Sequence, residues 1–167
     1  MRPPPPLIGI AVFMIVRRAG EILCLRRSAT GWMDGRVSLP AGRHEGGETL
    51  VSAAIRETRE EVALDLRRDG TIVGALDELR PRTRVLPPVI VRPFVATASS
   101  GATVEAGEEV ADLFWAPLDA IVDPGATRET EILARGLRTR RPAIHYRGHV
   151  IWGMTERIIA NLKEVLG

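Results

Sequence analysis

Residues 36 to 66 contain an extended segment, a glycine-rich loop and an amphipathic helix in direct succession. "RVSLP" reads as a short strand that stops at Pro40, because proline cannot donate to a sheet ladder. "AGRHEGGE" supplies the loop, and Thr49 is a suitable N-cap for a helix that extends to Leu66. At 100° per residue the positions expected to face the core share one arc, from about 100° to 180° when Glu57 is set to zero: Val51, Ile55, Thr58, Val62 and Leu66.

The same helix gathers three carboxylates on a different arc. With Glu57 at zero, Glu60 falls at about 300° and Glu61 at about 40°, so the three span about 100°. Like charges at these spacings repel by about 0.2–0.5 kcal/mol per pair in water. A hard divalent cation such as Mg²⁺ binds oxygen ligands and would remove this repulsion. We therefore expect the glutamates to point away from the core and to form a metal site.

The rest of the chain predicts an α+β fold. Apolar runs at 7–17 and 21–26, joined through Gly20, indicate a hairpin. Further strands are expected at 71–76, 88–98 and 111–118, and near "PAIHYRG", and a closing helix in "VIWGMTERIIANLKEVLG". The segment 120–141 yields no clear assignment. Two main helices among irregularly spaced strands favour a mixed β-sheet packed between helices, an α/β/α sandwich.

Length and composition limit the classes of protein and partner that this chain can represent. With 167 residues we expect a single domain over 7–167, after an extended lead-in at 1–6. The longest apolar run is too short for a membrane span and lacks signal-peptide features, which favours a cytoplasmic protein without a membrane partner. A net charge of +2 does not indicate a nucleic-acid partner. Cys24, alone among apolar residues, is expected to be a buried structural thiol.

The helix and its preceding loop resemble the Nudix box, G-x5-E-x7-R-E-U-x-E-E-x-G-U, where U is bulky and apolar. Thr58 occupies the first U position, and Ala63 replaces the final glycine, a change that bears on how the helix ends. Such a match over a 23-residue span, placed between a strand and a helix, is specific. The alternative is a solvated acidic helix face. Seven residues match: Gly42, Glu48, Arg56, Glu57, Glu60, Glu61 and Leu64.

The resemblance implies a Nudix fold and a hydrolase that cleaves a diphosphate linkage with Mg²⁺, or with Mn²⁺ as a substitute. It implies metal binding by Glu57 and Glu61, with Glu60 as a further ligand and the Gly42 backbone near the metal. Arg56 would brace the glutamates, and Glu48 would support the loop and helix. In many members of this family one of the box glutamates, or a carboxylate in a later loop, acts as the general base. For that later carboxylate Glu108 and Glu109 are the candidates.

Two further stretches, "LRPRTRVLPPVIVRPFVATA" and "YRGHVIWGMTERIIANL", resemble the coenzyme A diphosphatase subgroup of this family. That subgroup converts coenzyme A, or an acyl-CoA, into 3',5'-ADP and 4'-phosphopantetheine. Arginines suit a substrate with an extra 3'-phosphate, although these arginines could equally solvate a loop. The predicted substrate contacts are Arg80, Arg82, Arg84 and Arg92, with Trp32 as a residue that could stack on a base. Trp115 and Trp152 fit core positions better, and His149 is expected to be structural.

The upstream stretch "RRSATGWMDGRVSLPAGR" departs from the subgroup pattern, because Arg36, Leu39 and Ala41 replace glutamine, phenylalanine and glycine. It also resembles Nudix hydrolases that act on nucleotides. ADP-ribose, NADH and nucleoside triphosphates are therefore alternative substrates, and a non-catalytic Nudix module that senses a nucleotide is a further alternative. We expect a monomer or homodimer acting on a small-molecule diphosphate.

Overall fold

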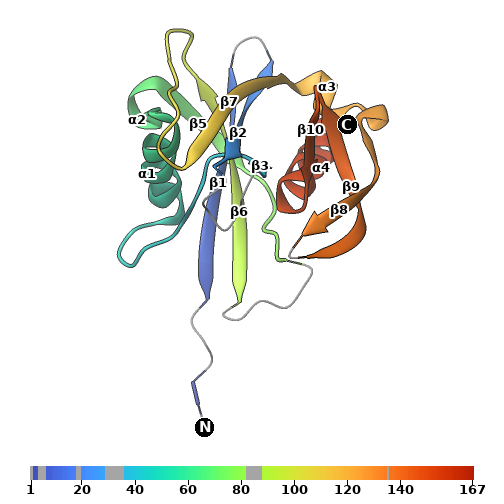
Figure 1. Cartoon of the computed structure of the whole chain (residues 1–167). Coiled ribbons are helices and arrows are strands. Elements are labelled where there is room, and N and C mark those ends of the chain that lie inside the picture. Colours follow the sequence, from blue (N-terminus) through green and yellow to red (C-terminus); the bar gives the residue numbers. More distant parts are fainter. Residues whose placement is uncertain (1, 4–6, 18–19, 29–35, 82–87, 135) are drawn as a thin grey trace.

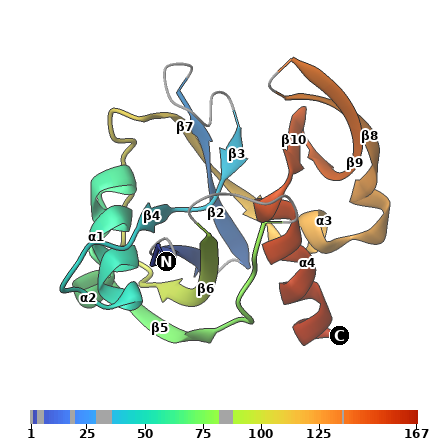
Figure 2. The same cartoon turned by 90° about the horizontal axis from the view of Figure 1, so that it is seen from below.

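The computed structural model describes all residues except 1, 4–6, 18–19, 29–35, 82–87 and 135. Most of the predicted lead-in and three of the predicted substrate contacts, Trp32, Arg82 and Arg84, lie outside the described residues. A mixed β-sheet separates α1 and α2 on one side from α4 on the other, which confirms the predicted α+β architecture (Figures 1 and 2). No helix within the described residues is both long and apolar enough to cross a membrane.

The main sheet has seven strands and mixed polarity. The central pair, β1 and β6, is parallel, and the other strands pair antiparallel. A second sheet of three antiparallel strands has the order β10-β9-β8. The main-sheet strands are β1 (Ile8–Arg17), β2 (Glu21–Arg27), β3 (Val37–Ser38), β4 (Ala41–Arg43), β5 (Gly70–Ala75), β6 (Val89–Ala98) and β7 (Val110–Pro117). The other elements are α1 (Leu50–Val62), α2 (Leu66–Asp69), α3 (Leu118–Val122), η1 (Pro124–Ala126), β8 (Thr127–Ala134), β9 (Leu137–Tyr146), β10 (His149–Trp152) and α4 (Met154–Leu166).

The predicted first hairpin is present, and the two strands diverge soon after it. β1 and β2 pair only beside their turn, where Arg17 faces Glu21 and Gly20 has a φ of 74°. Farther along, β3 pairs with β2 and β4 pairs with β1. The chain therefore crosses from β2 to β1 at Pro40, between β3 and β4. This crossing places the glycine-rich loop beside the centre of the sheet, directly before α1.

Two apolar clusters lie on opposite faces of the sheet. The cluster under α1 contains Phe13, Leu23 and Leu25 of the sheet, together with Ile55 and Val62 of the helix. The cluster on the other face contains Ile22, Cys24 and Val37 of the sheet, Leu39 of the link between β3 and β4 and, from the C-terminal region, Ile144, Ile151, Ile158, Ile159 and Leu162. Successive residues of a strand point to opposite faces, so β2 contributes to both clusters. The Cys24 thiol is buried as predicted, and its burial raises its pKa to about 12.

The C-terminal third differs most from the sequence-based expectation. The unassigned segment 120–141 contains α3, η1, strand β8 and the start of β9. The strand predicted near "PAIHYRG" is the end of the longer β9, which pairs with β8 along eight residues. The first residues of "VIWGMTERIIANLKEVLG" are not helical, because His149–Trp152 form β10 and pair with β9. The helix begins only after Gly153, whose φ is 74°.

Helix α1 begins as predicted, with the Thr49 side chain accepting a hydrogen bond from the Ser52 backbone N–H at 3.1 Å. It ends four residues before Leu66, and Asp65 caps the separate short helix α2. The reason is Ala63, which adopts the left-handed conformation at φ 58° and donates its N–H to the Arg59 carbonyl at 3.0 Å. Alanine thus makes the type of helix ending for which glycine is favoured.

Ala63→Gly is expected to stabilise the protein. An L-residue in the left-handed region is strained by about 1–2 kcal/mol, and part of that gain is offset by the freer unfolded chain of glycine. We expect the free energy of unfolding to rise by about 0.5–1 kcal/mol, measured by urea denaturation. Ala53→Gly, at the fourth residue of α1, is the matched control and should destabilise instead. A less stable Ala63→Gly protein would contradict the strain.

Thr58 carries a polar group into the core beneath α1. The residue is completely buried, and its hydroxyl has no hydrogen-bond partner within the described part of the chain. Valine has the same shape without the hydroxyl, so Thr58→Val removes the cost of an unsatisfied polar atom. We expect a gain of about 1 kcal/mol and a rise in Tm of about 2–4 °C. Thr49→Val, which removes the N-cap of the same helix, should lower Tm; an equal fall for Thr58→Val would show that its hydroxyl is satisfied.

Candidate active site

Gly42 of strand β4 and Glu57 of helix α1 lie in close contact. A Cβ atom built on Gly42 would lie 1.6 Å from Cγ of Glu57, far inside van der Waals contact. Gly42 pairs with Ala11 of β1, so its backbone is fixed by the sheet. Only glycine lets the Glu57 side chain lie over this strand, with 21% of that side chain exposed.

Arg56 holds the loop and the helix together. Its Nη2 donates to Oε1 of Glu48 at 2.8 Å and to the Arg43 carbonyl at 3.2 Å, and its Nη1 donates to Oε1 of Glu57 at 2.8 Å. Glu60 lies 3.6 Å from the same guanidinium and has 60% of its side chain exposed. Arg56 thus contacts both Glu48, in the loop, and Glu57, on the helix.

Glu61 is buried, contrary to the expectation that all three glutamates point away from the core. Only 7% of its side chain is exposed, and it forms an ion pair with Arg27 of β2. Its Oε1 also accepts the Ala41 backbone N–H at 2.8 Å. The strands β2 and β4 therefore cover one edge of the glutamate arc on α1, and the helical wheel alone does not show this cover.

Sequence reasoning missed Arg27, which is 13% exposed. Besides pairing with Glu61, its Nε donates to the Ser38 hydroxyl at 3.1 Å. The signal was present in the alternation of β2. Leu23 and Leu25 point to the α1 side of the sheet, and Arg27 follows at the same two-residue spacing.

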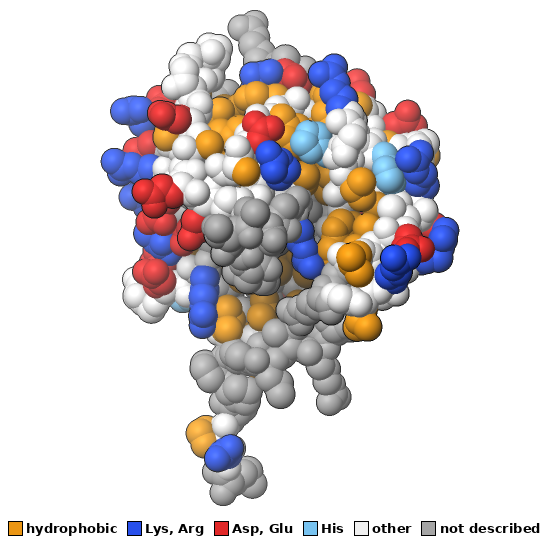
Figure 3. Space-filling model, viewed as in Figure 1, with side chains coloured by type: hydrophobic (Ala, Val, Ile, Leu, Met, Phe, Trp, Pro, Cys, Tyr) orange, Lys and Arg blue, Asp and Glu red, His pale blue; other side chains and the backbone are white. Residues whose placement is uncertain are grey.

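The electrostatics of the site separate Glu48 from the helix glutamates. The hydrogen bond from Arg56 holds the pKa of Glu48 below its usual value. Burial raises the pKa of Glu57, and the neighbouring Glu60 charge adds to that rise. Burial also raises the pKa of Glu61, although Arg27 opposes the shift. Burial therefore disfavours the charged forms of Glu57 and Glu61, on a face where acidic and basic side chains mix over α1 (Figure 3).

The loop before β7 closes over the end of α1. Gly107 donates its N–H to the Glu61 carbonyl at 2.8 Å, and Glu105 donates to the Val62 carbonyl at 2.9 Å. A Cβ on Gly107 would lie 2.5 Å from the Glu60 carbonyl oxygen, so glycine is required for this approach. Glu108 and Glu109, the predicted base candidates, follow in an exposed turn directly after the residues of this loop that contact the end of α1.

The predicted substrate arginines that the structure describes lie outside the glutamate cluster. Arg92 on β6 pairs with Glu78 at 3.0 Å. Arg80 is exposed, and its carbonyl accepts a hydrogen bond from Arg157 of α4 at 2.6 Å. The predicted core residues Trp115 and Trp152 are only half-buried, and Arg17 stacks on Trp115 at 4.4 Å. His149 packs against Phe114 at 4.1 Å between ring centroids, a structural contact as expected.

The glutamates offer the chemistry that a divalent cation needs. Carboxylate oxygens are hard ligands, and those of Glu57 and Glu61 have pKa values raised by burial. A cation bound to these two carboxylates would favour their charged forms. Within the described ranges no three Asp, Glu, His or Cys side chains are already gathered tightly enough to enclose an ion. Arg27 and Arg56 balance the charge of the glutamates here.

Comparison with known proteins identifies the family. The NUDIX domain model matches residues 5–136. The uncharacterized Nudix hydrolase NudL of Citrobacter koseri is 31% identical over 92% of this chain and 79% of its own length. That of Photorhabdus laumondii is 27% identical over 97% of this chain and 90% of its own length.

Solved structures show the same fold. The Ap4A hydrolase of C. elegans, in a binary complex, has a TM-score of 0.57 and 24% identity over 67% of this chain and 81% of its own. The NUDIX domain of Shewanella oneidensis NrtR, complexed with ADP ribose, has a TM-score of 0.62 and 16% identity over 100% of this chain and 91% of its own. The fold agrees with the family model and the NudL relatives, which place the chain in the Nudix hydrolase family, as an enzyme that hydrolyses phosphorus-containing anhydride bonds.

Proposed function

We propose that the protein is a Mg²⁺-dependent diphosphatase that splits coenzyme A, or an acyl-CoA, into 3',5'-ADP and 4'-phosphopantetheine. The observation that carries the catalytic part is the arrangement of Glu57, Glu60 and Glu61 on one arc of α1, next to the glycine-dependent contact with β4. When bound, Mg²⁺ supplies charge neutralisation on the phosphoryl oxygens and lowers the pKa of a coordinated water. Mn²⁺ can take the place of Mg²⁺ in this proposal.

The chain's own residues have distinct parts in this proposal. Glu57 and Glu61 hold the cation, and the exposed Glu60 is a further ligand. Arg56 is a positioning residue, because it fixes Glu57 through a 2.8 Å hydrogen bond and ties it to Glu48. Arg27 holds Glu61 in place from the sheet. A carboxylate of the neighbouring turn, Glu108 or Glu109, takes the proton from the attacking water.

The reaction adds the oxygen of that water to one phosphorus of the diphosphate as the P–O bond to the other phosphate breaks. Negative charge develops on the leaving phosphate as this bond breaks, and the site must neutralise it. Coenzyme A is supported by the two stretches that resemble the diphosphatase subgroup. One contact joins them, because Arg157 of α4 donates a hydrogen bond to the Arg80 carbonyl at 2.6 Å.

A substrate panel tests the proposal. Coenzyme A, ADP-ribose, NADH, a nucleoside triphosphate and a dinucleoside polyphosphate are each incubated with the protein and Mg²⁺, and products are separated by chromatography. We expect coenzyme A to have the highest kcat/KM and to give 3',5'-ADP. The isosteric Glu57→Gln is the matched inactive control, with kcat expected to fall on the order of 10³-fold. Faster cleavage of ADP-ribose would contradict coenzyme A as substrate, and no turnover of any compound would overturn the activity.

A further inference from the structure

His44 turns inward from the glycine-rich loop before α1. Residues 43 and 45–47 are exposed, whereas His44 is half-buried. Its backbone N–H donates to the Gly9 carbonyl of β1 at 2.8 Å, which continues the pairing of β4 with β1 by one residue. A Cβ built on Gly9 would lie 3.5 Å from Cβ of His44. The start of the histidine side chain is therefore held against the central strand of the sheet.

The ring of His44 closes the loop onto Glu48. Its Nε2 is hydrogen-bonded to the backbone carbonyl of Glu48. A carbonyl oxygen can only accept a hydrogen bond, so Nε2 must carry a proton. The chain between the two residues includes Gly46 and Gly47, and glycine backbones lose more conformational freedom on ordering than those of other residues. The ring contact therefore restrains a segment whose own backbone favours many conformations.

Glu48 transmits this restraint to the helix. Its Oε1 accepts the Glu45 backbone N–H at 3.0 Å and Nη2 of Arg56 at 2.8 Å, and its Oε2 accepts Nε of Arg56 at 3.3 Å. Arg56 in turn donates to Oε1 of Glu57 at 2.8 Å. The direction of the Glu48 side chain depends on the backbone that carries it, and His44 holds the carbonyl of that backbone. Contacts therefore run without a break from β1 to the Glu57 carboxylate.

We propose that His44 is a positioning residue for the hydrolase reaction. Its ring sets the loop backbone so that Glu48 and Arg56 hold the Glu57 carboxylate over β4. The proposal rests on the proposed part of Glu57 as a cation ligand, but it does not depend on which diphosphate is cleaved. Residues that orient metal ligands typically change metal affinity or activity by about 10- to 100-fold.

Two substitutions separate the hydrogen bond from the bulk of the ring. His44→Leu keeps a side chain of similar size and removes the donor. His44→Gln supplies an amide N–H that can donate to the same carbonyl. His145→Leu makes the same exchange on β9, in the small sheet, and is the matched control. The proposal requires glutamine to restore what leucine loses, which a space-filling role would not produce.

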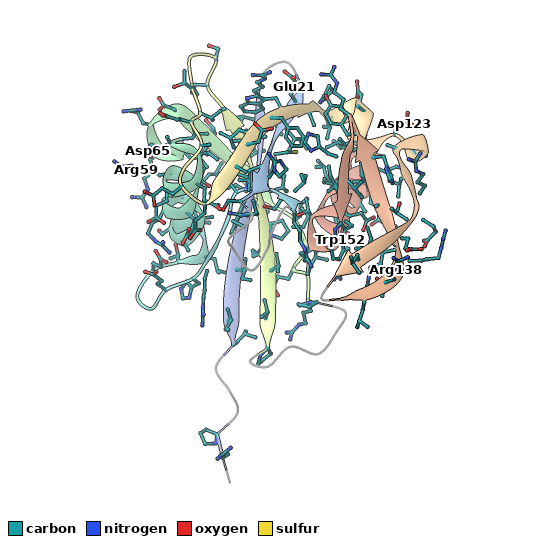
Figure 4. All side chains as sticks on the ribbon, in the orientation of Figure 1. Glu21, Arg59, Asp65, Asp123, Arg138 and Trp152 are labelled. Atoms are coloured by element: carbon teal, nitrogen blue, oxygen red, sulfur yellow. The ribbon has the colours of Figure 1, made fainter. Side chains whose placement is uncertain are left out.

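The first measurement needs neither metal nor substrate. NMR follows hydrogen exchange of the Arg56 Nε–H, which donates to Glu48, and Arg56→Lys identifies its signal. We expect exchange about tenfold faster in His44→Leu, and near wild type in His44→Gln and His145→Leu. Arg59 is exposed on the outer side of α1 (Figure 4), and its Nε–H is the internal reference. Unchanged exchange in His44→Leu, or equally fast exchange in His44→Gln, overturns the proposal.

Metal binding and kinetics then connect His44 to the reaction. The affinity for Mn²⁺, measured by electron paramagnetic resonance of the free ion, should fall about tenfold in His44→Leu and return in His44→Gln. With the compound that the wild type cleaves best, kcat should fall about tenfold at a fixed Mg²⁺ concentration, while the substrate KM stays within about twofold. Wild-type values of both the affinity and kcat in His44→Leu overturn the proposal. A wild-type protein that cleaves no compound contradicts the proposed function instead, and the exchange at Arg56 still decides whether His44 holds the loop.

The ring of the wild-type protein supplies a test that needs no substitution, should His44→Leu fail to fold. Nitrogen NMR of the histidine rings reports which ring nitrogen carries the proton. We expect the His44 signal to show a proton on Nε2, the atom that faces the Glu48 carbonyl. A ring that is protonated only on Nδ1 could not donate to this carbonyl and would overturn the proposal.

Discussion

Glu61→Gln is expected to abolish activity and to destabilise the protein by about 3 kcal/mol, since removing one partner of a buried ion pair leaves the other charge uncompensated. Glu61 is 7% exposed and Arg27 only 13%, so little water can replace the lost carboxylate. Glutamine still accepts the Ala41 N–H, and the loss therefore reports on the charge pair. Urea denaturation of the metal-free protein measures the stability, and the coenzyme A assay with Mg²⁺ measures the activity.

A double-mutant comparison tests whether the loss comes from the isolated charge. Arg27→Met/Glu61→Met replaces both charges with apolar groups, and such replacements are often close to neutral in stability. We therefore expect the double variant to be more stable than Glu61→Gln and still inactive. If Glu61→Gln matches the wild type in stability, the ion pair does not hold the helix to β2.

The burial of Glu61 also shows where sequence reasoning stops. Periodicity predicted the helix, its N-cap and the arc of apolar residues, because these depend on neighbours along the chain. The same helical wheel placed Glu61 beside that arc, at about 40°, but it could not show whether other parts of the chain bury this side chain. The cover comes from Arg27 and Ala41, which lie 34 and 20 residues away, and no local pattern specifies how the sheet meets the helix edge.

The small sheet was missed for a different physical reason. β8, "TRETEILA", has charged or polar residues at its first five positions, so it lacks the alternation of apolar and polar residues that predicts a half-buried strand. Its pairing with β9 includes an ion pair between Glu131 and Arg138. Cross-strand pairs of this kind stabilise a sheet, but they become visible only once the register is known.

Gly42→Ala is expected to lower kcat/KM by on the order of 10²-fold, since misplacing a catalytic group by about 1 Å has effects of this size. The added Cβ would lie 1.6 Å from Cγ and 2.4 Å from Cδ of Glu57. Because β4 is fixed by pairing with β1, the Glu57 side chain or the whole of α1 must move. The overpacked contact should also cost about 1–3 kcal/mol of stability. Steady-state kinetics with coenzyme A and thermal denaturation measure the two effects.

Gly46→Ala is the matched control for this prediction. Gly46 lies in the same loop, and a Cβ there meets no atom of the described residues within 4 Å, so stability and activity should stay near wild type. Gly42→Ala/Glu57→Ala removes the atoms that clash, and it should regain stability without regaining activity. The double variant separates two effects of the added methyl group, which are the contact with Glu57 and strain within β4. If the loss of stability persists in the double variant, the strain lies in β4 itself. Wild-type kcat/KM in Gly42→Ala would show that the position of Glu57 over β4 has no part in catalysis.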